Sequence, residues 1–170
     1  MKLFATLSLF ILLTLSGYSV TYSPQKGGNC YTLDIPDYMV RTYKLNEVAS
    51  LQYQNISKEA YTIVIADSKE QLAEIGVKFI DSKEFLKGFT DTYMADAKNR
   101  KLSQVTEFEI NGNKNAQTEL TWSTDDTDYY MLITVVESKE NFYKILCWTI
   151  TENKALLKDD FMSISKSLKD

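Results

Sequence analysis

Residues 129–136, YYMLITVV, and residues 142–150, FYKILCWTI, decide how this chain folds. Both segments are largely apolar at odd and at even positions alike. A strand with one face in water alternates apolar and polar residues, whereas a strand that is covered on both faces does not. We therefore expect both segments to be adjacent interior strands of a sheet that carries other structure on each side.

Helical periodicity flanks this strand-rich run, which spans residues 105–150, on both sides. Residues 67–70 and 81–84, both DSKE, place a helix-capping side chain three positions before a glutamate. Helices before and after the strands can cover both faces of a sheet. We therefore predict an α+β fold, a three-layer sandwich with a mainly antiparallel sheet covered by helices on both faces. The residues at helical spacing are Phe85, Phe89, Tyr93 and Ala97 before the run and Leu157, Phe161, Ile164 and Leu168 after it.

The segment 108–122, FEINGNKNAQTELTW, predicts a β-hairpin with an Asn-Gly pair in its turn. A two-residue Asn-Gly turn would pair Phe108 with Asn115 and so place the apolar set of one strand beside the polar set of the other. A three-residue loop at 111–113 pairs Phe108 with Ala116 and restores a common apolar face. We therefore predict the three-residue loop, with its glycine or its last asparagine in a left-handed conformation.

The N-terminal region is typical of an export signal, because a positively charged start precedes an apolar core and then small residues. We expect a signal peptide at 1–19, with cleavage near Ser19. A flexible lead-in follows at 20–28, where polar residues accompany a proline and two glycines. The remaining residues, 29–170, are long enough to bury the core of a single domain. No later stretch has the length and apolar content of a membrane span.

Two cysteines, Cys30 and Cys147, would meet an oxidising environment after export. In one interpretation they form a disulfide that joins the first strand to the last, which would stabilise the fold by about 3–5 kcal/mol in the chain-entropy account. In the other they are buried, small apolar side chains that do not meet. Both interpretations stay open, because the sequence does not give the separation of the two Cα atoms.

The composition argues against several functional classes. The chain has no histidine, so the commonest general base and metal ligand at neutral pH is missing, and neither a Ser-His-Asp nor a Cys-His site can be built. A formal net charge of -4, without any run of basic residues, argues against a nucleic-acid partner. We accordingly expect no metal site and no cofactor.

Two motifs suggest chemistry, and for both a plain structural interpretation is favoured. The acidic turn of Asp125, Asp126 and Asp128 lacks the glycine and the distal glutamate of a calcium loop, so we interpret it as an ordinary turn. Ser163 and Lys166 match the Ser-x-x-Lys pattern of penicillin-recognising enzymes, but the companion motifs are missing. A hydrolase with Ser-Lys or carboxylate chemistry remains as an alternative.

Tyrosines crowd the first third of the chain, and Tyr38, Tyr43 and Tyr53 are the candidate binding residues. An exposed patch of tyrosines can bind a protein partner, since each ring offers apolar area and a hydroxyl group. The alternative is that they are half-buried strand residues, which is where tyrosine is commonly found.

Four segments in this order resemble the PsbP-like superfamily. They are YTLDIPDYM at 31–39, the hairpin at 108–122, YKILCWTI at 143–150 and FMSISKSL at 161–168. That group includes photosystem extrinsic proteins, a Ran-binding import factor and exported bacterial proteins of the DcrB type. The resemblance implies the fold and an accessory or docking role without catalysis. The metal-binding residues of the photosystem members have no counterpart here, because there is no histidine and no matching motif.

These observations predict an exported, non-enzymatic accessory or binding protein that is periplasmic or extracellular. Its expected partner is a protein at the cell envelope. The alternatives are the hydrolase described above and a structural or stress-related factor with no fixed ligand.

Overall fold

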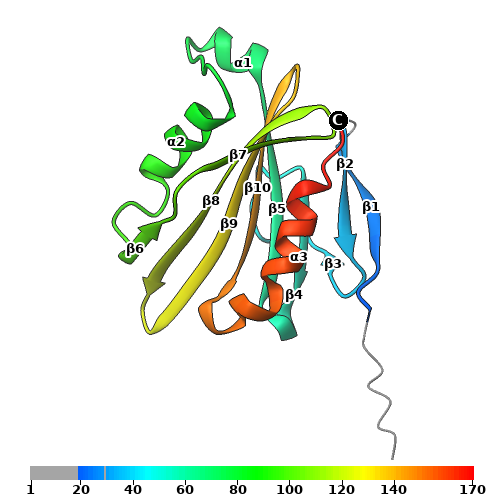
Figure 1. Cartoon of the computed structure of the whole chain (residues 1–170), viewed down its shortest axis with the longest axis vertical. Coiled ribbons are helices and arrows are strands. Elements are labelled where there is room, and N and C mark those ends of the chain that lie inside the picture. The colour runs from blue at the N-terminus through cyan, green and yellow to red at the C-terminus, as the bar shows by residue number, and fades with distance from the viewer. Residues whose placement is uncertain (1–18, 29) are drawn as a thin grey trace, which may run out of the picture.

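The computed structural model describes residues 19–28 and 30–170, and Figure 1 shows the arrangement of their elements. The predicted signal peptide therefore falls outside the described residues, apart from Ser19. The strands are β1 (Tyr22–Gly27), β2 (Tyr31–Pro36), β3 (Val40–Arg41), β4 (Leu51–Asn55), β5 (Ala60–Ser68), β6 (Lys98–Leu102), β7 (Thr106–Ile110), β8 (Asn113–Thr124), β9 (Thr127–Glu137) and β10 (Asn141–Ile150). The helices are α1 (Lys69–Glu74), α2 (Ser82–Thr92) and α3 (Lys154–Lys166), with short 3-10 turns η1 (Ile56–Lys58) and η2 (Thr151–Asn153).

The main sheet has the strand order β3-β4-β5-β10-β9-β8-β6, and β7 pairs with the other half of β8. Every one of these pairings is antiparallel. The two segments that the sequence placed in the interior are β9 and β10, and they are adjacent central strands as expected. The predicted, mainly antiparallel sheet is confirmed.

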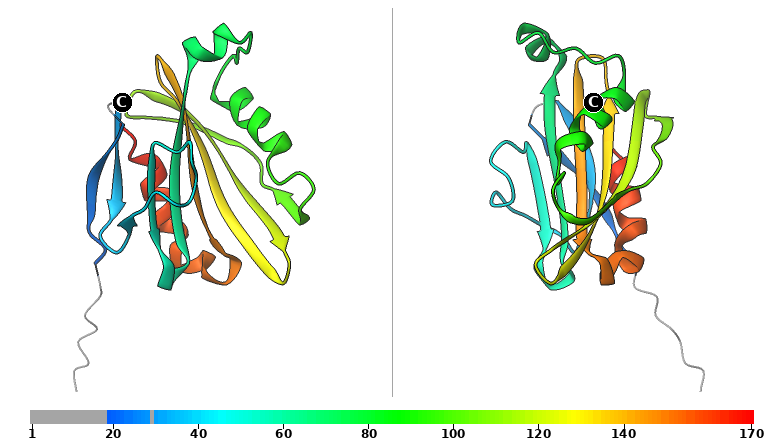
Figure 2. Two further views of the ribbon diagram at one scale, coloured as in Figure 1. Left: turned by 180° about the vertical axis from the view of Figure 1, so that it is seen from behind. Right: turned by 90° about the vertical axis from the view of Figure 1, so that its left-hand side faces the viewer.

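Successive residues of β9 and β10 enter two different apolar clusters, because side chains alternate between the faces of a strand. Leu132 and Ile145 belong to one cluster with Leu157 and Phe161 of α3 and with residues of β2. Met131, Ile133 and Leu146 belong to the other cluster with Phe85 and Leu86 of α2. The views in Figure 2 show how α2 and α3 lie relative to the sheet. An apolar run without alternation is therefore explained by two cores, one for each parity.

The expected flexible lead-in is instead a paired strand, which corrects that prediction. β1 pairs with β2 over its whole length in a separate two-stranded sheet. The hydroxyl of Tyr22 also donates to Asp160 Oδ1 of α3 at 2.7 Å, and the ring of Tyr31 packs where a side chain at position 27 would otherwise stand. Because Gly27 has no side chain, the ring of Tyr31 can approach its backbone closely.

The predicted three-residue hairpin loop is wrong, and the rejected two-residue turn is the one observed. Ile110 pairs with Asn113 and Phe108 with Asn115. Asn111 and Gly112 have φ values of 53° and 78°, as a type I′ turn requires at both central positions. β7 buries neither face fully, since Phe108 and Ile110 on its apolar face are only part-buried. The apolar pattern therefore constrained the register weakly, and the turn residues decided it.

Local hydrogen bonds define the limits of the helices. Asp81 accepts from the backbone N–H of Glu84 at 2.8 Å, as the capping pattern predicted. For α1 the cap is Ser68, one residue later than expected, because β5 continues through Asp67 and ends at Ser68. The guanidinium of Arg100 in β6 donates to the carbonyls of Thr90 and Tyr93 at the end of α2, and it satisfies acceptors that a helix leaves free at its C-terminus.

Candidate binding surface

The three candidate tyrosines do not form one exposed patch, which corrects the sequence-based prediction. Tyr43 is 76% exposed, but Tyr53 is buried in the core. The hydroxyl of Tyr53 donates to Gln25 Oε1 at 2.8 Å and accepts from Arg41 Nε at 3.1 Å. Tyr53 therefore ties β1 and β3 to β4, and the alternative of part-buried structural tyrosines describes it better.

Tyr38 is half-buried, and it shares a hydrogen-bond acceptor with Tyr22, the carboxylate of Asp160. Their hydroxyls donate to Asp160 Oδ2 at 2.6 Å and Oδ1 at 2.7 Å. Burial first, and then the hydrogen bond to Asp160, raise the pKa of Tyr38 well above its ordinary value and raise the pKa of Tyr22 to about 12. Both hydroxyls therefore stay protonated at neutral pH and hold the N-terminal strands on α3.

The two cysteines are both free, so the disulfide interpretation is corrected. Cys30 is exposed at the β1–β2 turn, whereas Cys147 is fully buried within β10. The Sγ atom of Cys147 accepts a hydrogen bond from Thr62 Oγ1 at 3.5 Å. The second interpretation is half right, because Cys147 is a buried apolar side chain and Cys30 is not.

The residues of the hydrolase alternative are not arranged for catalysis. Ser163 Oγ donates to the backbone carbonyl of Asp159, one turn earlier in α3, at 2.9 Å. The ammonium of Lys166 lies 5.8 Å from the centre of the Phe108 ring. A nucleophile and its base need a hydrogen bond between them, and this serine donates elsewhere.

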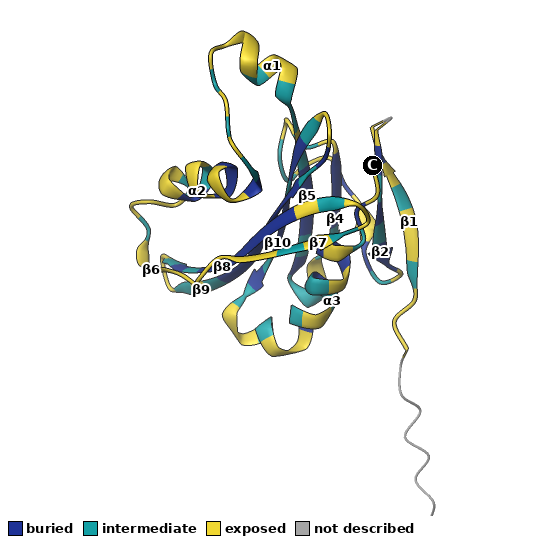
Figure 3. Ribbon diagram, turned by 45° about the horizontal axis from the view of Figure 1, so that its top comes forward, coloured by how far each residue is buried: buried dark blue, intermediate teal, exposed yellow. Residues whose placement is uncertain are grey.

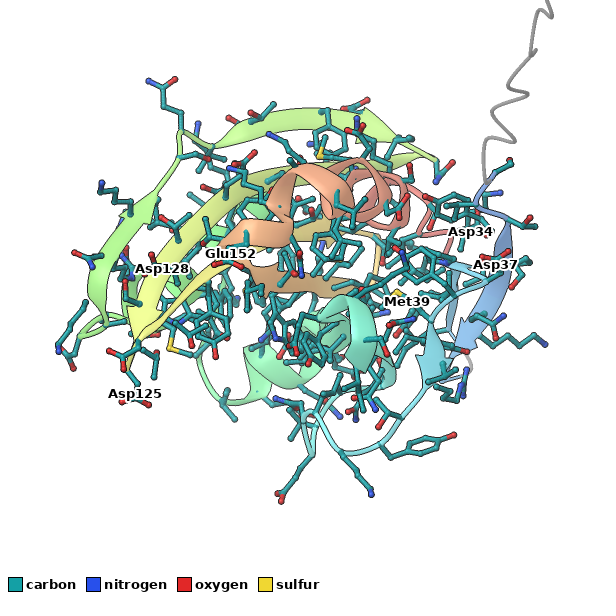
Figure 4. All side chains as sticks on the ribbon, turned by 90° about the horizontal axis from the view of Figure 1, so that it is seen from below. Asp34, Asp37, Met39, Asp125, Asp128 and Glu152 are labelled. Carbon is teal, nitrogen blue, oxygen red and sulfur yellow. The ribbon has the colours of Figure 1, made fainter. Side chains whose placement is uncertain are left out.

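The acidic turn lies where β8 passes into β9. Asp128 accepts a hydrogen bond from Ser123 Oγ at 2.6 Å. Figure 4 shows Asp125 and Asp128 at one side of the molecule and Asp34 and Asp37 at the other. Within residues 19–28 and 30–170, no group of three or more cysteines or carboxylates could hold a metal ion.

A different surface stands out, formed by the segment that contains α1 and leads into α2. We call it the α1–α2 surface, and Figure 3 shows that α1 projects from the body of the molecule with most of its residues exposed. Ile80 is 85% exposed and Ile75 is 74% exposed. A single exposed apolar residue is ordinary, but apolar side chains gathered in one projecting segment beside a pocket are typical of an interaction site. The apolar residues of this surface are Leu72, Ile75, Val77, Phe79 and Ile80.

An apolar pocket of about 290 Å³ opens beside this segment. Phe79 and Phe142 lie in its wall with their ring centroids 6.1 Å apart. Ile80 lines this pocket and also a second one, in which Lys83 and Val105 take part. The apolar residues that line the pocket are Leu72, Ala73, Val77, Phe79, Ile80 and Phe142.

An ion pair between Lys69 and Glu137 lies in the wall of the apolar pocket. Lys69 Nζ donates to Glu137 Oε1 at 2.9 Å and to the carbonyl of Ser138 at 2.8 Å. The other carboxylate oxygen of Glu137 accepts from the backbone N–H of Ser82, the first residue of α2, at 3.0 Å. A carboxylate near a helix N-terminus is stabilised by the helix dipole. Glu137 therefore links α1, α2 and the end of β9.

A groove runs from this surface along β7, and we call it the α2–β7 groove. It contains two pockets of about 360 Å³ each, and Asp81 lines both of them. Lys83 of α2 and Glu107 of β7 form an ion pair of 2.6 Å across the groove. One pocket is lined by Asp81, Ser82, Glu107, Phe108, Glu109, Lys114 and Asn115, and the other by Ile80, Asp81, Lys83, Glu84, Lys87 and Val105.

Sequence reasoning missed both isoleucines of the α1–α2 surface. The available signal was their position in the break between two capped helical patterns, where polar residues are usual and no packing partner is near in sequence. Nothing in the sequence showed that α1 projects, because that depends on where β5 ends.

Comparison with known proteins gives the same architecture. CyanoP, the PsbP protein of the cyanobacterium Synechocystis sp. PCC 6803, matches with a TM-score of 0.62 at 12% sequence identity, over 91% of this chain and 94% of that chain. LpqN, involved in cell envelope biogenesis of Mycobacterium tuberculosis, matches with a TM-score of 0.60 at 10% identity, over 88% of this chain and 90% of that chain. No family profile and no curated protein sequence matches the chain.

The chain therefore has a PsbP-like fold, and the resemblance drawn from its sequence segments is confirmed at the level of the fold. Neither α1, α2 nor α3, the helices of the part that the structure describes, is long and apolar enough to span a membrane.

Proposed function

We propose that this chain is an exported accessory protein of the cell envelope that binds a protein partner through the α1–α2 surface and catalyses no reaction. The observation that carries the proposal is the exposure of Ile75 and of Ile80, which lines an apolar pocket, in one segment that projects from the fold. Burying an isoleucine side chain contributes about 1.5–3 kcal/mol. Two such side chains and a pocket are enough to centre a contact between proteins.

The envelope location rests on two supports. The sequence begins with the pattern of an export signal, and one protein of the same fold, LpqN, is involved in cell envelope biogenesis. Fractionation of cells that express the full chain, with mass spectrometry of its N-terminus, tests this part. An intact N-terminus on a cytosolic protein would contradict it.

We also infer a three-layer sandwich, with α2 and α3 as the outer layers. The support is the division of the core into two clusters, one with α3 and the other with α2. In this arrangement the sheet is a rigid middle layer, and the α1–α2 surface lies at one end of one outer layer. A rigid scaffold lowers the entropic cost of presenting a binding surface.

The binding surface is tested with a pair of matched double variants. Ile75→Ser with Ile80→Ser removes the exposed apolar side chains of the α1–α2 surface. Val40→Ser with Val48→Ser is the control, because these residues are 61% and 72% exposed elsewhere on the molecule. The bait is the purified chain, the sample is envelope extract, and captured proteins are quantified by mass spectrometry.

The expected result is a set of proteins captured by wild type and by the valine control, and reduced about tenfold with the isoleucine variant, which corresponds to 1.4 kcal/mol. Equal capture by all three proteins would overturn the assignment of the surface. Circular dichroism and thermal melts of each variant confirm that the fold is retained.

A further inference from the structure

β7 presents a free backbone edge beside the α2–β7 groove. In a hairpin with a two-residue turn, the residues next to the turn form a hydrogen-bonded pair, and such pairs then alternate along the strands. Ile110 and Asn113 flank the turn, so the backbone groups of Thr106, Phe108 and Ile110 point toward β8. The N–H and C=O groups of Glu107 and Glu109 point away from β8, and among the described residues no other strand pairs with β7.

Three other edge strands, β1, β3 and β6, carry features that oppose pairing with another chain. β1 contains Pro24 and Lys26, and β3 has only two residues. β6 carries two lysines and an arginine and has an irregular register against β8. Proline, lysine, bulges and short length are the devices by which edge strands avoid intermolecular pairing. β7 has no proline, lysine or bulge, and its sequence TEFEI alternates without interruption. Its charged residues are two glutamates, which oppose pairing with an acidic strand and favour a basic one.

Side chains of an added strand would meet two pockets of different chemistry on the α2 side of β7. Glu107 faces α2, since it pairs with Lys83, whereas Phe108 faces Lys166 of α3 on the opposite side. One pocket of the groove is acidic, because Asp81, Glu107 and Glu109 line it with Lys114 as its only basic residue. The second pocket has Ile80 and Val105 in its wall beside the chains of two lysines.

We propose that the free edge of β7 binds an extended segment of a partner protein as an additional antiparallel strand. The segment places a lysine or arginine opposite Glu109, in the acidic pocket, and an aliphatic residue four positions later, opposite Val105. Backbone hydrogen bonds to Glu107 and Glu109 hold the strand, and the two pockets select its sequence. This inference rests on the proposed function and specifies the chemistry of the partner at the groove next to the α1–α2 surface.

Charge argues for a basic partner segment and against a second copy of this chain. If two copies paired antiparallel about Phe108, Glu107 of each copy would lie opposite Glu109 of the other. Like charges directly opposite on neighbouring strands are destabilising. The carboxylate of Glu109 has no ion-pair partner within the described residues, whereas that of Glu107 is paired with Lys83.

Two synthetic peptides test the proposal by NMR titration of the ¹⁵N-labelled chain. The probe is acetyl-Thr-Arg-Thr-Thr-Thr-Ile-Thr-amide, and the control carries Glu in place of Arg. The protein variants are Glu109→Pro, which removes both the outward N–H and the carboxylate but leaves the ladder with β8, and Glu109→Gln, which removes the charge and keeps the N–H. Spectra outside residues 105–110 establish that both variants are folded.

Saturable binding of the arginine peptide is expected, with the largest shift changes at residues 105–109 and an affinity about tenfold above that of the glutamate peptide. Glu109→Pro is expected to weaken both peptides, and Glu109→Gln only the arginine peptide. Absence of saturable binding, equal affinity for the two peptides, or shifts centred on β1, β3 or β6 would overturn the inference. The proposed function is judged separately, because the peptides are titrated onto a chain that keeps Ile75 and Ile80, whereas the capture experiment changes these two residues and leaves Glu109 unchanged.

Discussion

At the scale of single residues, the two cysteines show that residue type alone predicts neither a disulfide nor the reactivity of a thiol. Export would favour a disulfide, but Cys30 lies at an exposed turn and Cys147 in the centre of the sheet. Burial raises the pKa of the Cys147 thiol to about 12, and a thiol reacts as the thiolate. The two cysteines therefore differ in reactivity by their positions alone.

This difference predicts the outcome of thiol labelling. In the native protein without reductant, iodoacetamide is expected to modify Cys30 and to leave Cys147 unmodified until urea unfolds the chain. Peptide mass spectrometry identifies the modified residue. Recovery of a cystine that joins the two residues would contradict the structure.

Glu119 of β8 predicts how the stability of the fold changes at acidic pH. Its carboxylate accepts from Lys154 and Lys158 of α3 at 2.8 and 2.7 Å. Burial alone raises the pKa of Glu119, but the two ammonium groups outweigh it and hold the pKa below the ordinary value of 4.5. The stabilisation is therefore complete above pH 4.5 and is lost as the pH falls through the lower folded value.

Glu119→Gln is expected to lower the free energy of unfolding by about 1 kcal/mol at pH 7. The difference from wild type should shrink below pH 4.5, where the wild-type carboxylate also becomes protonated. Urea unfolding at pH 7 and pH 3 measures both effects. A difference that is the same at both pH values would show that the ion pairs do not stabilise α3.

At the scale of elements, the β7–β8 hairpin shows that turn chemistry outweighs pattern when a strand is exposed. A common apolar face matters only where that face is buried, and β7 buries neither face fully. Asn111 and Gly112 adopt positive φ values that most residues avoid. The Asn-Gly pair therefore sets the register that the apolar pattern did not.

The register is checked by NMR through contacts between Hα atoms. In an antiparallel pair these atoms approach closely at positions without hydrogen bonds, so cross-peaks are expected between Glu109 and Lys114 and between Glu107 and Ala116. Gly112→Ala should destabilise the hairpin by about 1 kcal/mol through backbone strain alone, because nothing lies within 4 Å of the added carbon. A cross-peak between Hα atoms of Phe108 and Ala116 would support the three-residue loop instead.

At the scale of the whole molecule, the N-terminal hairpin completes one of the two cores. Tyr31, Leu33 and Ile35 of β2 lie in the same cluster as α3 and the central strands. β1 covers the edge of β2, and Tyr22 reaches Asp160 on α3. Contacts of this kind join the first and the last parts of the chain into one folding unit.

Removal of residues 19–28 is therefore expected to lower the free energy of unfolding by roughly 2–4 kcal/mol, because it leaves β2 without its partner strand. Tyr22→Phe should cost about 1 kcal/mol through the lost hydrogen bond to Asp160. Ser23→Ala, at an exposed position of the same strand, is the control. If the truncated chain unfolded at the wild-type urea concentration, β1 would contribute nothing to stability.

The sequence by itself determined the central strands, the amphipathic α3, the cap of α2, the absence of histidine chemistry and the resemblance that led to the fold. These features depend on periodicity and on residue chemistry over short distances, which a sequence displays directly. The antiparallel neighbours β9 and β10 followed from apolar runs at both parities, because only a doubly covered strand tolerates them.

Only the tertiary structure decided the pairing of β1, the burial of Tyr53, the separation of the cysteines and the exposure of Ile75 and Ile80. Each of these depends on which distant segments meet, such as Tyr22 with Asp160 or Tyr53 with Gln25. A tyrosine has the same local pattern whether its hydroxyl finds a partner in the core or water at the surface. Surfaces for binding are what remains uncovered after all the elements have packed, so the chain order alone could not reveal them.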